Sequence, residues 1–185
     1  ISREVLATAL ANIPYALVSY APDGAWPEGP GYWSYGTGHL ISTLAALESA
    51  LGTDFGLGSL PGLSETGLYR VNMVGPTGAL FNDSDSGLNE AWNGDEPILF
   101  WLSRRYGQPL LAWAGREAAA GNSGRAIGSG PLDLIWYDSR GSVDNLKRNP
   151  LDVFYQGNKA IALLRSAWAD REALFVGFKG GNNGF

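Results

Sequence analysis

Residues 22–36, PDGAWPEGPGYWSYG, combine rigid aromatic rings with a backbone rich in turn residues. Trp26, Tyr32, Trp33 and Tyr35 offer flat apolar faces, and Glu28 places a carboxylate among them. Rings that stack on sugar rings, beside a carboxylate that binds hydroxyl groups, form a common carbohydrate site. The four glycines and three prolines predict a preorganised loop that loses little entropy when it meets a ligand. The alternative interpretation is an aromatic plug between helices.

Other residue types exclude several kinds of site. The chain has no Cys and a single His, His39, so no zinc site of His and Cys ligands is predicted. His39 lies beside the apolar face of a predicted helix, and we interpret it as a packing or polar flanking residue. The stretch at 81–90, FNDSDSGLNE, fails as a calcium loop, because Gly87 falls at position 5 rather than 6 and Gly94 stands where a Glu should close it. We predict a capped turn there that borders a cleft and contains Asn82.

Basic residues are candidates for holding an acidic ligand, but no pair has the spacing of a clamp. Arg104 and Arg105 end a predicted helix, where cations favour the helix dipole, and this indicates a structural role. Arg125 in a Gly-rich connector and Arg165 in a predicted strand are left as unranked candidates.

The overall composition is that of a globular chain with a negative net charge. Its 185 residues are 45% hydrophobic and 17% charged, enough for one domain with a core, or for one and a part. The net charge of -5 argues against a nucleic-acid partner, which would call for a basic face. No apolar run approaches the roughly 20 residues that a membrane-spanning helix needs, so no membrane partner is predicted.

Helical periodicity dominates the first two thirds of the chain. Apolar residues recur at spacings of 4, 3 and 4 in two segments: Leu6, Leu10, Ile13 and Leu17, then Leu40, Leu44, Leu47 and Leu51. These patterns predict helices over residues 2–19 and 37–51, joined as a helical hairpin by the loop at 22–36. Gly52 is a candidate C-cap for the second helix.

Three more helices are expected before residue 122. One is short and lies near residues 65–74. The others are GDEPILFWLSRRYG, with Asp95 as N-cap and Gly107 as terminator, and QPLLAWAGREAAAG, which repeats the plan from Pro109 to Gly121. Both are apolar on most faces, as in the inner layer of a multi-helix assembly.

The pattern changes after residue 121. GNSGRAIGSGP is a Gly/Ser-rich connector, and LDLIWYD is a short apolar run that we interpret as a short strand. DVFYQGNKAIALLRSAW holds two strands around a Gly157–Asn158 turn, and EALFVGFKG reads as a third. We therefore divide the chain into a mainly helical part at 1–121, a linker with a short strand at 122–149, and the opening of a β domain at 150–185.

The segment YAPDGAWPEGPGYWSYGTG, followed by LAALESALGTDFGL, resembles the heparinase II/III-like polysaccharide lyases. GPTGALFNDSDSG, WYD and the strand series DVFYQGNKAIALLRSAW…ALFVGFKGG give further support, so the resemblance spans nearly the whole chain. It implies a mainly α fold: a partial (α/α) toroid of helical hairpins, followed by the first strands of an antiparallel β-sandwich. It also implies β-elimination at a uronic acid of an acidic polysaccharide, and hence a periplasmic or secreted location.

In such a reaction a base removes the C5 proton, a neutralising group stabilises the enolate-like charge, and an acid protonates the leaving oxygen. The resemblance assigns the proton transfers to Tyr32, with Tyr35 as second choice. A phenol needs a nearby cation to act as base, because its unperturbed pKa is about 10. Trp26, Glu28, Trp33 and Asn82 are the candidate substrate-binding residues, although a structural role for Glu28, accepting loop N–H bonds, is the stronger interpretation.

The chain departs from the family at both ends. The Asn-His pair that neutralises the substrate carboxylate and the His-rich stretch where some relatives bind a metal are both absent from it. We therefore expect a fragment with no cofactor of its own, inactive alone, whose exposed inner helical faces favour a homodimer. A metal site is expected only in the missing C-terminal part.

Two other function classes fit the same residues. A glycoside hydrolase on a helical toroid would need two carboxylic acids across the scissile bond, and Asp23, Glu28 and Asp83 are the candidates. A non-catalytic glycan-binding helical module would keep the aromatic segment and need no proton donor.

Overall fold

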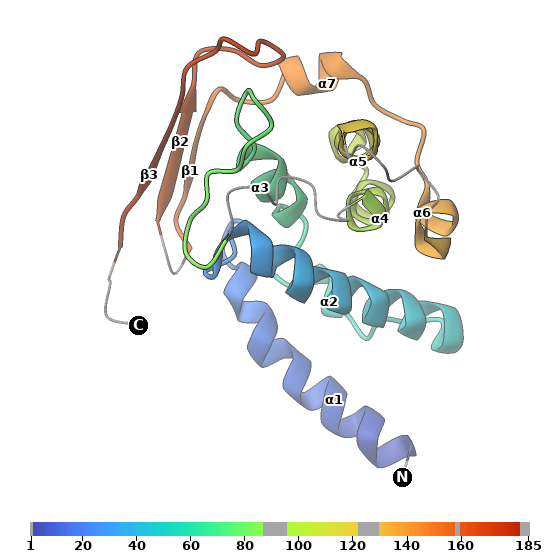
Figure 1. Ribbon diagram of the computed structural model, residues 1–185. Helices are drawn as coiled ribbons and strands as arrows, with labels where there is room; N and C mark the ends of the chain where they lie inside the picture. Colours follow the sequence, from blue (N-terminus) through green and yellow to red (C-terminus); the bar gives the residue numbers. More distant parts are fainter. Residues whose placement is uncertain (1, 87–95, 122–129, 158–159, 182–185) are drawn as a thin grey trace.

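The computed structural model describes residues 2–86, 96–121, 130–157 and 160–181. About 53% of the chain is helical, and one small antiparallel sheet accompanies the helices, so the predicted mainly α class is confirmed (Figure 1). None of the helices in the described ranges is long and apolar enough to cross a membrane.

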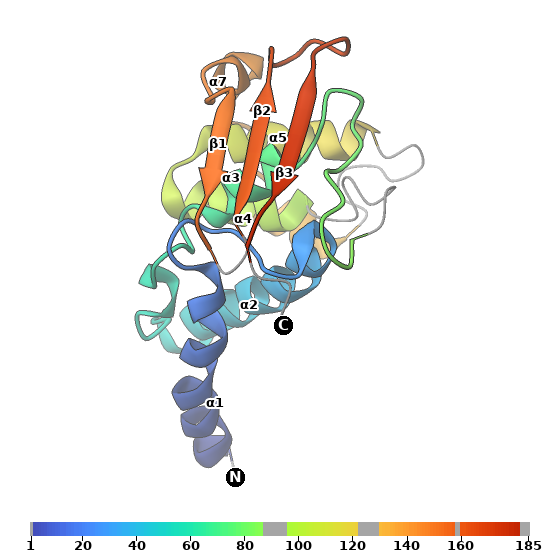
Figure 2. The same cartoon turned by 90° about the vertical axis from the view of Figure 1, so that its left-hand side faces the viewer.

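The first helix, α1 (Ser2–Leu17), matches its prediction and continues into a 3₁₀ turn at Val18–Tyr20. Pro14 is accommodated within it. Figures 1 and 2 show α1 projecting from the body of the molecule, at an angle to α2 (Gly29–Leu51). The two helices thus form an open V rather than the expected close hairpin.

Helix α2 begins eight residues earlier than predicted, so the second half of the 22–36 segment is helical and not a loop. Pro30 lies in the first turn, where its missing N–H costs no hydrogen bond. Trp33, Thr37, Ile41 and Leu44 are fully buried on one face, and their burial outweighs the poor helix propensity of the surrounding glycines. At the other end Gly52 caps α2 in a left-handed conformation, as predicted, but Leu51 is exposed.

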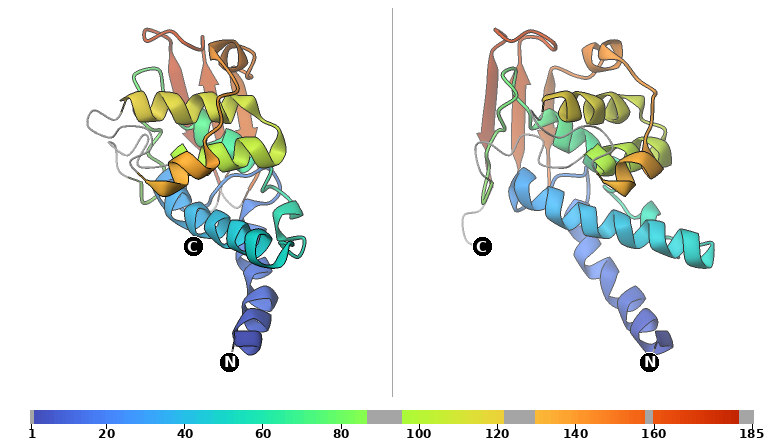
Figure 3. Two further views of the ribbon diagram at one scale, coloured as in Figure 1. Left: turned by 90° about the vertical axis from the view of Figure 1, so that its right-hand side faces the viewer. Right: turned by 45° about the vertical axis from the view of Figure 1, so that its right-hand side comes forward.

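Helices α3 (Thr66–Asn72), α4 (Glu96–Tyr106) and α5 (Pro109–Gly121) also follow their predictions. Figure 3 shows α4 and α5 stacked side by side above α2. Their facing sides are tightly buried, with Leu99, Phe100, Leu102 and Leu111 fully enclosed. The predicted N-cap Asp95 and the candidate Arg125 lie outside the described residues.

The apolar run at residues 131–136 is a helix, α6 (Pro131–Trp136), so the predicted short strand is wrong. Pro131 occupies the first turn, and the Asp133 carboxylate accepts a hydrogen bond from the Gly130 N–H (3.1 Å), which starts the helix. A further short helix, α7 (Val143–Lys147), was not predicted; Ser142 caps it by accepting a bond from the Asp144 N–H.

Strands β1 (Asp152–Tyr155), β2 (Ile161–Arg165) and β3 (Phe175–Lys179) form the predicted antiparallel sheet in the order β1-β2-β3. The predicted Gly157–Asn158 turn lies partly outside the described residues. Figure 2 shows the strands side by side in front of the helices. Inner-face residues such as Ile161 and Leu163 join the same buried cluster as Trp33, while the outer face exposes Phe154 and Phe178.

Candidate functional site

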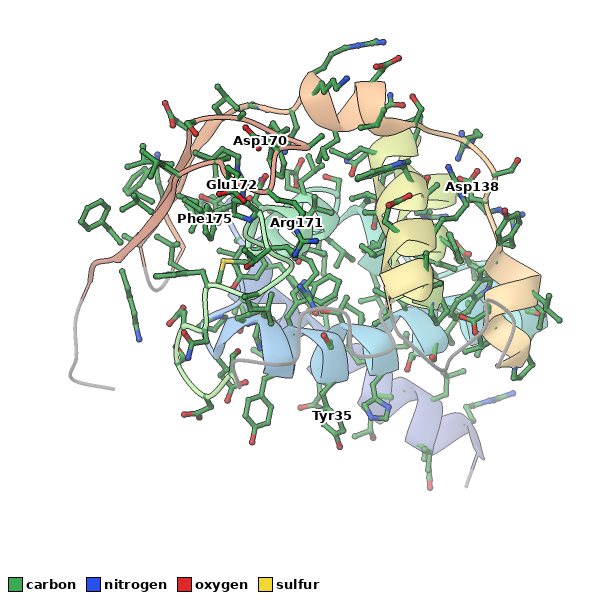
Figure 4. All side chains as sticks on the ribbon, turned by 45° about the horizontal axis from the view of Figure 1, so that its top comes forward. Tyr35, Asp138, Asp170, Arg171, Glu172 and Phe175 are labelled. Atoms are coloured by element: carbon green, nitrogen blue, oxygen red, sulfur yellow. The ribbon has the colours of Figure 1, made fainter. Side chains whose placement is uncertain are left out.

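The exposed face at the start of α2 carries the two candidate catalytic tyrosines. Tyr32 is 46% exposed and Tyr35, one turn later, is 68% exposed. Figure 4 shows Tyr35 pointing away from the helix, and His39, also exposed, lies edge-on to its ring at 4.7 Å. Among the residues described, no group forms a hydrogen bond with either tyrosine hydroxyl. This face therefore offers two accessible phenols and one imidazole in a single stripe.

Trp33 points the opposite way, and its predicted role in binding substrate is wrong. Its side chain is fully buried, and its indole N–H donates to Thr66 Oγ1 (2.7 Å). The Thr66 hydroxyl in turn donates a hydrogen bond to the Gly24 carbonyl (2.7 Å). The Arg70 guanidinium lies 5.9 Å from the centre of the Trp33 ring. Because the helical register turns position 33 inward, this ring is a core residue.

Trp26 is also mainly a packing residue. It is partly buried, with its ring 4.8 Å from Tyr20, and a Cβ on Gly36 would lie only 3.2 Å from it. Its indole N–H is buried and has no acceptor among the described groups. Trp26 thus fills the space between the 3₁₀ turn and α2. The plug interpretation describes both tryptophans, while the two tyrosines remain exposed.

Glu28 precedes α2 and is exposed. The prediction that its carboxylate accepts loop N–H bonds is wrong, because it forms no side-chain cap and no other hydrogen bond with the described residues. The N-terminal amides of α2 find other acceptors: the Gly31 N–H donates to Ser86 Oγ (2.9 Å). The Glu28 carboxylate is left one turn before Tyr32, on the exposed side of the molecule.

The turn at residues 82–86 holds the start of α2 in place. A hydrogen bond from the Ser86 N–H to the Asp83 carbonyl (3.3 Å) closes it, as the predicted turn requires. The Asp83 side chain is wholly buried and forms an ion pair with Lys179 of β3 (3.2 Å). Asn82, the first residue of this segment, is exposed and lines a cavity of about 330 Å³ against β3.

Two of the three carboxylates nominated for a hydrolase are held by structural contacts. Asp23 accepts a hydrogen bond from the Gln156 N–H at the end of β1. Asp83 is enclosed and ion-paired, so it faces no open space. Of the three candidates only Glu28 is accessible, and a hydrolase needs two carboxyl groups flanking one bond.

Of the other six tyrosines, Tyr15 and Tyr137 are exposed as well, and the remaining four are wholly or partly buried. Desolvation raises the pKa of Tyr106 to about 12, and raises the pKa values of Tyr20, Tyr69 and Tyr155 further. These phenols are committed to packing: the Tyr155 hydroxyl, for example, accepts a bond from Asn72 Nδ2 (2.8 Å). Burial keeps these phenols protonated, so their base forms are not available for proton removal.

The structural role predicted for Arg105 is confirmed: it forms ion pairs with Glu48 (2.5 Å) and Asp54 (2.7 Å). Arg104 donates to the Ile135 carbonyl (3.0 Å) and so ties α4 to α6. Both line a 640 Å³ cavity at the far end of α2. Arg165 is buried, and desolvation lowers its pKa to about 10.

No group of three or more His, Asp or Glu side chains suited to a metal ion occurs in the part of the chain that the structure describes. Sequence reasoning missed Lys179 as the partner of Asp83, and it missed Arg171, which lines two cavities. No signal in the sequence pairs Lys179 with Asp83, because their contact depends on how the 82–86 turn packs against β3.

No protein-family model matches this chain, and no curated protein is detectably similar to it. The candidate site therefore rests on the residues themselves: the exposed Tyr32 and Tyr35 of α2, and the Glu28 carboxylate before it, which forms no hydrogen bond with the described residues.

Proposed function

We propose that this chain acts on acidic, uronic-acid-containing polysaccharides as a β-eliminating lyase, with Tyr32 as its proton-transfer residue. The observation that carries the proposal is the exposed phenol of Tyr32 on a backbone held at its neighbour Gly31 by Ser86. An accessible side chain on a fixed backbone is the arrangement that proton transfer requires. The sequence resemblance to heparinase II/III-like lyases supports the same residue.

In this mechanism the Tyr32 oxygen removes the proton at C5 of a uronate. The electrons of that C–H bond form the C4–C5 double bond as the bond from C4 to the glycosidic oxygen breaks, and the leaving oxygen takes up a proton. The charge that develops on the uronate carboxylate has to be neutralised by a cation. No Arg or Lys among the described residues contacts the Tyr32 hydroxyl, so the described contacts supply the phenol but not this cation.

The proposal includes the finer architecture and the setting. The helical part would belong to an (α/α) toroid, and the sheet would be one layer of a β-sandwich. The exposed outer face of the sheet, with Phe154, Leu164, Val176 and Phe178, supports the second statement, because a second sheet packed on it would cover these side chains. A second copy of the chain in a homodimer is the alternative cover. A polysaccharide substrate places the protein in the periplasm or outside the cell.

A glycan-binding module without catalysis is the second candidate. Among the described residues no Arg or Lys contacts the Tyr32 hydroxyl, and this favours the module, since stacking of Tyr32 and Tyr35 on sugars needs no proton transfer. A hydrolase is less well supported, because Asp23 and Asp83 are engaged elsewhere.

The experiment incubates the complete gene product with a panel of uronic-acid polysaccharides and follows the ultraviolet absorbance of the new double bond. Tyr32→Phe should lower turnover by roughly 10²–10⁴-fold, the usual contribution of general acid–base catalysis. Tyr35→Phe is the matched control on the same face and should retain turnover. Reducing ends without this absorbance would favour the hydrolase, and binding without turnover would favour the module.

A further inference from the structure

Two cavities meet at Arg171, in the connection between β2 and β3. The first, of about 380 Å³, is lined by residues of α3, α5 and α7 and by this connection, and includes Trp113 and Trp168. The second, of about 330 Å³, lies between the segment at 75–82 and β3, and includes Asn82. Gly75, Pro76 and Arg171 line both cavities. We call this pair of cavities the Arg171 groove.

The walls of the groove are fixed by close packing. A Cβ on Gly75 would lie 3.0 Å from the Phe175 ring, and one on Gly177 would lie 2.4 Å from the Phe81 ring. Both glycines therefore allow an aromatic ring to pack directly against the opposite backbone. The segment at 75–82 is held against β3 in this way, so the second cavity is built into the fold.

Trp168 is held by a buried cation. The Arg165 guanidinium lies 3.4 Å from the centre of the Trp168 ring and 4.7 Å from that of Phe175. Its Nη atoms donate to the carbonyls of Asn72 and Val74, and the Trp168 N–H donates to the Asn149 carbonyl (2.9 Å). An indole fixed on one face and through its N–H is a rigid surface on which a sugar can stack.

Arg171 is exposed, and no carboxylate among the described residues lies within ion-pair distance of it. Figure 4 shows Arg171 near Asp170, Glu172 and Phe175, which belong to the same part of the chain. The Asp170 carboxylate accepts the Glu172 N–H (3.0 Å) and so is turned onto its own loop. Arg165 and Glu117 line the first cavity only, whereas Arg171 lines both, so Arg171 is the cation best placed for a ligand that reaches both cavities.

The groove ends next to the turn that holds the start of α2. Asn82 at its end is followed by the turn that clamps α2, in which Ser84 Oγ donates to the Pro27 carbonyl (3.4 Å) and Ser86 accepts from Gly31.

We propose that the Arg171 groove binds successive sugars of an acidic glycan, with Arg171 holding a uronate carboxylate and Trp168 stacking on a neighbouring ring. The choice of glycan rests on the proposed function, whereas the groove itself is a site separate from Tyr32. A planar guanidinium matches a carboxylate with two parallel hydrogen bonds, and the amide of Asn82 suits hydroxyl groups.

The test is a calorimetric titration of the 185-residue chain with uronic-acid tetrasaccharides, and with a neutral glucose tetrasaccharide of the same length. Arg171→Gln should weaken binding of the acidic tetrasaccharide at least about tenfold, the size expected for a charge-assisted hydrogen bond. Arg148→Gln is the control, because Arg148 is also exposed but lines neither cavity.

Equal binding by Arg171→Gln and by the wild type would contradict the proposal that the Arg171 groove binds an acidic glycan. Equal affinity for the neutral tetrasaccharide, or no binding at all, would also contradict it. None of these results decides the lyase proposal, which is judged separately by double-bond absorbance. Conversely, weakened binding in Arg171→Gln without turnover in any form would support the groove and reject the lyase.

Discussion

Trp33 and Tyr35 lie two residues apart on one helix but differ completely in their exposure to solvent. Trp33 is fully enclosed and bonded to Thr66, whereas Tyr35 is 68% exposed and bonded to no described group. Residues two apart on a helix point to different sides, so the first turns of α2 serve the core and the surface at once. The aromatic segment is therefore part plug and part exposed surface, and each role can be tested separately.

The largest effect is expected from Trp33→Ala. It removes a buried ring and leaves a cavity, which should lower the free energy of unfolding by about 3–5 kcal/mol. Tyr35→Ala, the control on the exposed side, should change it by no more than about 0.5 kcal/mol. Urea denaturation measures both. Similar losses for the two variants would contradict the assignment of opposite faces.

The next effect concerns the clamp at the start of α2. Gly29 has a φ of +82°, and a Cβ there would lie 2.2 Å from the Asp83 carbonyl oxygen. Gly29→Ala should cost about 1–2 kcal/mol in left-handed strain and about 1–3 kcal/mol more in the clash. Gly52→Ala isolates the strain, because Gly52 has a similar φ of +73° and no atom within 4 Å of its Cβ position. Equal losses in the two variants would show that the clamp is loose.

Thr66→Val probes the polar contact of the plug. The variant keeps the shape of the side chain but leaves the Trp33 N–H and the Gly24 carbonyl without their buried partner. The expected loss in the free energy of unfolding is about 1–3 kcal/mol, measured by thermal or urea denaturation. Thr66→Ser, which retains the hydroxyl, should recover part of that loss, and no difference between Val and Ser would contradict this contact.

The smallest effect on stability should come from Tyr32→Phe. The Tyr32 hydroxyl forms no hydrogen bond with the described residues, so its removal should leave the free energy of unfolding within about 0.5 kcal/mol of the wild type. A larger loss in denaturation would assign Tyr32 a structural role and remove the basis for interpreting its exposed phenol as functional.

Much of the fold follows from apolar spacing. Regular spacing located α1, the end signals Pro109 and Gly121 located α5, and strand-like runs around Gly157–Asn158 located the strands. The start of α2 was not predicted, because its glycines and prolines are typical of loops. The burial of Trp33 in the core outweighs these local preferences. The signal was there: Trp33 precedes Leu44 by eleven residues, or about three turns, and so extends the apolar stripe backward.

The short helices and the site depend on contacts that no local pattern encodes. Helix α6 is set by the Asp133 cap and by the bond from Arg104 to Ile135. The exposure of Tyr32 and the enclosure of Asp83 follow from how the 82–86 turn packs on α2, a contact between residues more than fifty positions apart. Residue types nominated these candidates, but only the packing separates accessible groups from buried ones.

The central claim is that Tyr32 transfers a proton on an acidic glycan. The most direct measurement compares double-bond absorbance from uronic-acid polysaccharides for the complete wild-type gene product, Tyr32→Phe and Tyr35→Phe. Our account predicts that absorbance grows with the wild type and Tyr35→Phe and is lost in Tyr32→Phe, with all three equally stable. Undiminished turnover in a folded Tyr32→Phe variant would contradict it.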